Sequence, residues 1–146
     1  MKTLVLAYFI MLYSLATAQQ PGELSVTIRN IYPAEGELYI AIYDDPSSYL
    51  NPDAALQRRV LKVEADTLQL RFSNMQPGTY AIAVFQDLNG NGLLDESGKG
   101  IPLEPFGFSN DARGKLGPAK YKNASFTMNQ DMKIEINLVN NAEQIP

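Results

Sequence analysis

An acidic segment near the middle of the chain has the residue spacing of a calcium-binding loop. Oxygen-bearing side chains stand at relative positions 1, 3, 5 and 9 of residues 87–95, namely Asp87, Asn89, Asn91 and Asp95. Glycine at position 6 allows a tight curl, and the backbone carbonyl of Leu93 is available at position 7. A hard cation takes about six to eight oxygen ligands, and alternate side chains on a curled backbone converge on one point. The spacing therefore predicts a calcium site.

The segment departs from an EF-hand in two respects. Position 12 is Gly98 instead of a bidentate glutamate, and the residues before the loop have the pattern of a strand. The closing carboxylate is then expected from Glu96 or Glu104. Two carboxylates and two amides predict a weak site, with a dissociation constant on the order of 10⁻⁴ to 10⁻³ M. The alternative is a bare turn, because Asn-Gly pairs favour turns without any ion.

The residues that follow offer a second candidate, a ligand-contact loop. Glu104, Phe106 and Phe108 lie among rigid prolines, and Tyr121 is a further ring in the same long segment. These rings are candidates for apolar platforms in a binding face. We favour the alternative that they fold back and close one open end of the domain as a small hydrophobic cluster.

Carboxylate chemistry is the remaining catalytic option. Asp95, Glu96, Glu104 and Asp111 are candidates for the acid pair of a glycoside hydrolase, which needs a separation of about 5 to 9.5 Å. Acidic loops bind ions or water more often than they cleave glycosides, so the sequence favours a protein that is not an enzyme.

Composition excludes several other classes of function. The chain has no His and no Cys among its 146 residues, which removes Ser-His-Asp triads, thiol nucleophiles, disulfides and the usual zinc ligands. Twelve basic residues against sixteen acidic ones give a formal charge of −4, so nucleic acid is not an expected partner.

The N-terminus has the pattern of a secretory signal peptide. Lys2 precedes an apolar run at residues 4–15, and Ala16-Thr17-Ala18 forms a small-residue cleavage site. The run is shorter than the roughly 20 residues of a membrane-spanning helix. We expect cleavage after Ala18, a single domain over residues 19–146, no transmembrane segment after cleavage, and export to the periplasm, the outer surface or the medium.

Apolar residues alternate with polar ones along most of the remaining chain, which predicts strands with one buried face. Two hairpins are expected, one from residues 24–28 and 38–42, the other from 124–128 and 132–139. Residues 80–85 are apolar on both faces, as in a central strand. Residues 68–72 alternate cleanly and 56–65 less so, whereas 87–122 show no period and are expected to be one long loop. The pattern predicts an all-β, antiparallel two-sheet sandwich of about seven strands, with a small barrel as the alternative.

Three motifs in succession carry a family resemblance. The strand start Pro77-Gly78-Thr79-Tyr80, the loop 87–92 and the segment Gly100-Ile101-Pro102 through Phe106-Gly107-Phe108-Ser109 together resemble an exported bacterial family known as domain of unknown function 2141. The resemblance implies a β-sandwich, immunoglobulin-like or prealbumin-like by analogy, with a location in the bacterial cell envelope or outside the cell, and it supplies no activity. Asp87, Asn89, Asn91 and Asp95 are the only positions to which it adds support as ligands.

The leading interpretation is a non-catalytic binding or structural module of the cell envelope with calcium as its only expected cofactor. Its partner would be an envelope protein, a glycan or a small ligand. A carboxylate-based hydrolase is the alternative. A third hypothesis is a structural module that contacts other envelope proteins through exposed strand edges.

Overall fold

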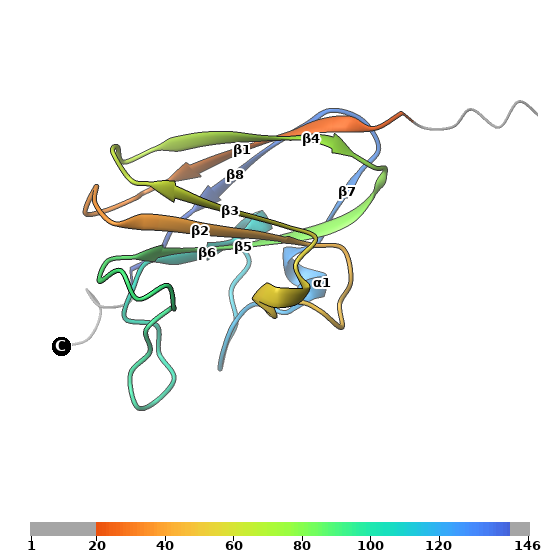
Figure 1. The fold of residues 1–146 in the computed structure, drawn as a ribbon. Coiled ribbons are helices and arrows are strands. Elements are labelled where there is room, and N and C mark those ends of the chain that lie inside the picture. Colours follow the sequence, from red (N-terminus) through yellow and green to blue (C-terminus); the bar gives the residue numbers. More distant parts are fainter. Residues whose placement is uncertain (1–19, 141–146) are drawn as a thin grey trace, which may run out of the picture.

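The protein is a sandwich of two β-sheets, seen in a computed structural model that describes residues 20–140 (Figure 1). This confirms the predicted all-β sandwich. The described residues form eight strands: β1 (Gly22–Arg29), β2 (Glu37–Tyr43), β3 (Gln57–Lys62), β4 (Leu68–Met75), β5 (Gly78–Asp87), β6 (Phe106–Phe108), β7 (Phe126–Met128) and β8 (Met132–Asn137). Two 3₁₀ turns, Pro52–Ala54 and Ser109–Asp111, and the one-turn helix α1 (Tyr121–Ala124) complete the elements of the described residues. The predicted signal peptide lies outside the described residues. Within residues 20–140, no helix is long and apolar enough to cross a membrane.

The smaller sheet has three strands in the order β4-β1-β8. β1 runs antiparallel to β4 and parallel to β8, so one strand pair departs from the antiparallel arrangement of the sandwich. The β1–β8 register brings Val26 beside Ile134 and Ile28 beside Ile136.

The larger sheet has five strands and is organised around β5. β2 lies along one edge of β5, and β3 continues the sheet beyond β2. The other edge of β5 is shared, because β7 pairs with residues 78–80 and β6 pairs with residues 83–85. The prediction that residues 80–85 form a central strand is confirmed.

The main core fills the space between the two sheets. Alternate residues of β1 and β2, including Leu24, Val26, Leu38 and Ile40, are 0–2% exposed and face each other across this space. The period of two in the sequence arises because each sheet presents one face to the core. A second, smaller cluster is built on Ala81, Phe108, Ala112, Ala119 and Ala124. Ala81 alternates with core residues along β5, so this cluster covers the opposite face of the larger sheet.

Both predicted hairpins are wrong. The first two strands lie in different sheets, because residues 30–36 carry the chain from β1 across to β2. The turn at residues 129–131 likewise carries it from β7, on the larger sheet, to β8, on the smaller one. Alternation reports which face of a strand is buried, but it does not say which strand lies beside it.

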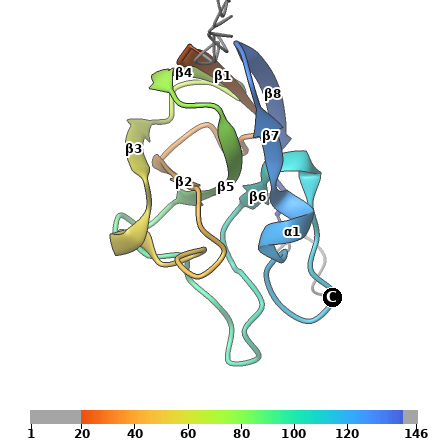
Figure 2. The ribbon, with the colours of Figure 1, turned by 90° about the vertical axis from the view of Figure 1, so that its right-hand side faces the viewer.

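The predicted long loop over residues 87–122 is divided in two by β6. Residues 88–105 connect β5 to β6 and contain the acidic residues, and we call this segment the acidic loop. Residues 109–125 connect β6 to β7 and include α1, and we call this segment the basic loop. Both loops project below the sandwich in Figure 1, the acidic loop at the left and the basic loop, which leads to α1, to its right (Figures 1 and 2).

Candidate metal centre in the acidic loop

The acidic loop follows the last residue of β5, which is Asp87. This residue is paired with Glu37 of β2 and is only 1% exposed. Gly36 approaches it so closely that an added Cβ would lie 2.2 Å from the Asp87 carbonyl oxygen, and its φ is +75°. Glycine is therefore required at position 36 to let the turn before β2 pack against the base of the loop.

The Asp87 carboxylate binds the backbone of the loop that follows it. Gly90 N–H donates to Oδ1 and Gly92 N–H donates to Oδ2, both at 2.7 Å. Such bonds from neutral donors to a carboxylate are roughly twice as strong as neutral ones. The first carboxylate of the predicted calcium loop thus curls the backbone around itself.

Glu104 closes the other side of the loop. Its carboxylate is 4% exposed and accepts Leu88 N–H at Oε1 (2.8 Å) and Asp95 N–H at Oε2 (3.0 Å). The Asp95 carbonyl in turn accepts Leu103 N–H at 2.8 Å. The two ends of the acidic loop are therefore joined through one buried side chain.

Three polar side chains converge on the exposed side of this frame. The amide groups of Asn89 and Asn91 both donate to the Asp95 carboxylate, and the Asn91 bonds are 3.1 and 3.2 Å long. The amide oxygens accept backbone N–H groups two residues on, at Asn91 (3.1 Å) and Leu93 (2.8 Å). The structure thus brings Asn89, Asn91 and Asp95 together, whereas Asp87, the first predicted ligand, is 1% exposed and bound to backbone N–H groups. Leu93, whose backbone carbonyl is the remaining predicted ligand, is 66% exposed.

Glu96 and Asp111, the two other predicted site carboxylates, make different contacts. Glu96 forms an isolated β-bridge with Pro102. Asp111 accepts Asn137 N–H at 2.8 Å and the Asn137 side-chain amide at 2.7 Å, at the end of β8. Within residues 20–140, no group of three or more His, Cys, Asp or Glu side chains is placed to hold a metal ion. Any ion in the acidic loop would therefore rely on amide and backbone oxygens beside Asp95.

The aromatic residues of the predicted ligand-contact loop pack inward. Phe108 is 6% exposed and Phe106 is half-buried, with their ring centroids 5.9 Å apart. Tyr49 contacts Phe108, Tyr121 and Tyr43 at centroid distances of 6.5, 5.5 and 5.4 Å. Burial raises the pKa of the Tyr49 hydroxyl well above its usual value and raises that of Tyr121 as well. The rings form a small hydrophobic cluster on the outer face of β5.

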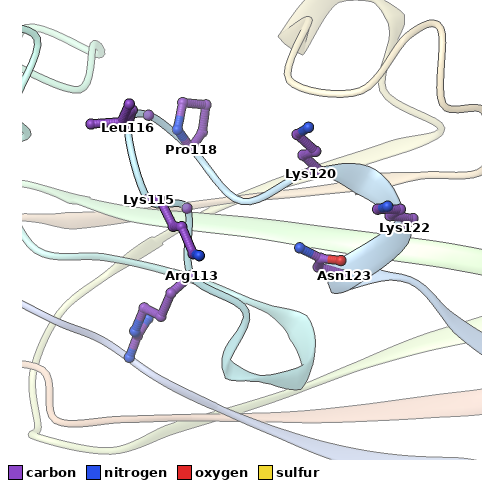
Figure 3. A pocket seen from close by; sticks show the side chains of 9 residues that line it. Arg113, Lys115, Leu116, Pro118, Lys120, Lys122 and Asn123 are labelled. Atoms are coloured by element: carbon purple, nitrogen blue, oxygen red, sulfur yellow. The ribbon is translucent and has the colours of Figure 1, made fainter.

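Two features escaped the sequence analysis. Gln86 is fully buried, and its amide donates to the carbonyl oxygens of Pro33 (2.6 Å) and Glu35 (2.8 Å), which holds the turn before β2 against β5. The sequence signal for this contact is a single glutamine that directly follows the apolar residues 80–85. The second feature is a hollow in the basic loop, drawn in Figure 3. The sequence signal for this hollow is a run from position 113 to 122 that contains four basic residues and no acidic one. The negative charge of the whole chain obscured this local excess of positive charge.

Comparison with known proteins gives one result. Residues 26–137 match the model of domain of unknown function 2141, described as an uncharacterised protein conserved in bacteria. The chain belongs to this family. The match covers every strand except the start of β1 and confirms the resemblance seen in the motifs. No curated protein and no solved structure was found to match the chain.

Proposed function

We propose that this member of the family is a non-catalytic binding or structural module of the bacterial cell envelope, with a weak calcium site in the acidic loop. One observation carries the calcium proposal. Asn89, Asn91 and Asp95 converge on the exposed side of a loop whose backbone is already held by Asp87 and Glu104. A preorganised frame lowers the ordering cost of binding.

The chemistry of the three side chains fits calcium in kind. Carboxylate, amide and backbone carbonyl oxygens are the ligands that calcium takes, and the Leu93 carbonyl is at the expected position in the sequence. Binding has a cost, because the amide groups of Asn89 and Asn91 must give up their hydrogen bonds to Asp95 and turn their oxygens to the ion. With one carboxylate at the point of convergence, we expect millimolar affinity, which suits a protein outside the cytoplasm.

The absence of catalysis is inferred from how the carboxylates are used. Both oxygens of Asp87 and of Glu104 accept backbone N–H groups, and Asp111 is bound by Asn137. A glycoside hydrolase needs two carboxyl groups that face each other across a substrate. These groups are instead committed to the backbone of the loop or to a neighbouring strand, so they support a structural role.

The calcium proposal is tested by thermal unfolding of the purified protein in chelator and in rising calcium. We expect the midpoint to rise with calcium, with a stabilisation of about 1.4 kcal/mol at a free concentration about ten times the dissociation constant. Asp95→Asn should abolish the rise. Asp53→Asn, at an exposed acid whose one ion pair is with Arg58, is the matched control and should keep it. A midpoint that does not move at tens of millimolar calcium would contradict the proposal.

The proposal of an envelope location has a separate test. Fractionation of the producing bacterium should recover the protein outside the cytoplasm, and its N-terminal residue should be Gln19, which follows the predicted cleavage site. An intact N-terminus on protein in the cytoplasmic fraction would contradict export.

A further inference from the structure

The basic loop encloses a hollow on the surface of the protein. It has a volume of about 580 Å³ and lies between residues 113–118 and the helix α1 (Figure 3). Its lining carries four basic side chains, those of Arg113, Lys115, Lys120 and Lys122, together with the amide of Asn123. The volume falls within the range of about 300 to 1,000 Å³ that is typical of small-molecule sites.

The charge of this segment is opposite to that of the rest of the protein. Residues 113–123 contain four basic residues and no acidic one, whereas the other eight basic residues of the chain stand against sixteen acidic ones. The remainder of the chain thus has a formal charge of −8 around a local charge of +4. Asp111, the nearest acidic residue in sequence, accepts two hydrogen bonds from Asn137. The hollow is therefore a concentrated positive site on an acidic protein.

These four cations have no partner among the described residues. No ion pair or side-chain hydrogen bond is formed by Arg113, Lys115, Lys120 or Lys122 within residues 20–140, whereas Arg29, Arg58, Lys62 and Arg71 each pair with a carboxylate. Four like charges brought together repel one another, which raises the free energy of the unliganded loop. An anion in the hollow would relieve that repulsion.

Buried contacts give the hollow a defined shape. Ala112, Ala119 and Ala124 are 0–8% exposed and anchor the loop to the cluster on β5. Ser109 Oγ–H donates to the Ala124 carbonyl at 2.5 Å and accepts Ile82 N–H at 2.9 Å, which ties the start of the loop to α1 and to β5.

Gly114 is the tightest point of the loop. A Cβ added there would lie 1.8 Å from the Gly117 carbonyl oxygen and 2.6 Å from that of Pro118. The loop can therefore close on itself only because position 114 has no side chain. A substitution of Gly114 would therefore change the shape of the hollow without changing its charge.

We propose that the hollow binds a phosphate-bearing ligand. A phosphate ester offers up to two negative charges and three acceptor oxygens in a small volume, and lysine ammonium groups bind it as compact point charges. Three lysines and one arginine around one hollow suit two neighbouring phosphate groups or a phosphorylated headgroup. This site uses none of the residues of the acidic loop, so it stands independently of the calcium proposal.

Two probes distinguish a soluble phosphate from a lipid headgroup. Calorimetric titration with inorganic pyrophosphate, in calcium-free buffer at low ionic strength, measures binding of a soluble phosphate. Sedimentation with vesicles of phosphatidylcholine, with or without phosphatidylglycerol, measures binding of a lipid headgroup. We expect saturable pyrophosphate binding that weakens as sodium chloride is added, because counter-ions screen exposed charges. Additional binding only to the phosphatidylglycerol vesicles would assign the phosphate to a lipid.

Three variants test whether the hollow is responsible. The double variant Lys115→Gln with Lys122→Gln should weaken pyrophosphate binding at least about tenfold, a change of about 1.4 kcal/mol. Lys133→Gln with Lys99→Gln removes the same charge from positions outside the hollow and should leave binding within about twofold. Gly114→Ala keeps every charge but cannot keep the close approach, and it should also weaken binding.

Three outcomes would overturn the proposal. The first is the failure of both pyrophosphate and phosphatidylglycerol vesicles to bind. The second is an equal loss of binding in the Lys115/Lys122 and Lys133/Lys99 double variants, which would mean that only the net charge matters. The third is unchanged binding by Gly114→Ala, which would show attraction to a charged segment without a shaped site. Circular dichroism of each variant checks that the sandwich is intact.

Discussion

The acidic and basic loops flank the same short strand, β6, yet they are held in opposite ways. The acidic loop is shaped by charged groups, since the buried carboxylates of Asp87 and Glu104 accept four backbone N–H groups. The basic loop is shaped by small buried residues such as Ala119 and by the hydroxyl of Ser109, while its charged side chains remain outside. Charges used for structure are not free for ligands. This difference is the basis for proposing ligand binding at Asp95 in one loop and at the four cations in the other.

Removing the Asp87 carboxylate, around which the acidic loop curls, should have the largest effect on the free energy of unfolding. Asp87→Ala leaves the N–H groups of Gly90 and Gly92 without their charged acceptor at the end of β5. We expect a loss of about 2–4 kcal/mol in the free energy of unfolding, since a hydrogen bond to a charged group contributes about 1.5–3 kcal/mol. Urea unfolding followed by circular dichroism measures it.

The control for this prediction is Asp53→Ala, because the Asp53 side chain is 93% exposed and pairs with Arg58 at 3.5 Å. It should change the free energy of unfolding by no more than about 0.5 kcal/mol. Equal effects of the two variants would show that the Asp87 carboxylate does not organise the loop.

The matching change in the basic loop is Ser109→Ala. It leaves the Ile82 N–H and the Ala124 carbonyl without a buried partner, which costs about 1–3 kcal/mol. The free energy of unfolding should fall by this amount, and hydrogen exchange should accelerate in residues 112–124 but not in residues 88–95. Faster exchange in both loops would contradict their independence.

The smallest expected change in the free energy of unfolding comes from the aromatic cluster beneath the basic loop, and it is seen at high pH. Burial raises the pKa of Tyr49, so the neutral hydroxyl is favoured in the folded protein. The associated stability is fully present below pH about 10, where tyrosines of the unfolded chain are also neutral, and it is lost as pH rises above that value. Urea unfolding between pH 8 and 11 should show this loss, and Tyr49→Phe should reduce it. Tyr32→Phe, at a ring that is 70% exposed, is the matched control. An identical loss in Tyr49→Phe would contradict the assignment.

The sequence located the strands well because burial of one face leaves a local trace. Leu24, Val26 and Ile28 alternate in the sequence, and all three are 0% exposed in the fold. The pairing of strands leaves no such trace. Residues 30–36 and 129–131 look like hairpin turns, but each carries the chain between sheets, so both hairpin predictions failed.

The spacing in the acidic loop predicted the meeting of Asn89, Asn91 and Asp95, because alternate residues of a tight curl face the same point. It did not distinguish the roles of the two buried carboxylates. Glu104 stands 16 residues from Leu88, whose N–H it accepts, and only the return of the chain into β6 brings them together. The hollow of the basic loop likewise depends on a close approach at Gly114 that no residue pattern reveals.

The most direct test of the two proposed sites is nuclear magnetic resonance of a ¹⁵N-labelled sample, titrated with calcium and, in a second calcium-free sample, with pyrophosphate. We predict that calcium shifts the backbone amides of residues 87–95 and the side-chain amides of Asn89 and Asn91, and leaves residues 113–123 unchanged. Pyrophosphate should shift residues 113–123, including the Asn123 side-chain amide, and leave residues 87–95 unchanged. Shifts in neither loop, or shifts of the same loop by both ions, would contradict the account.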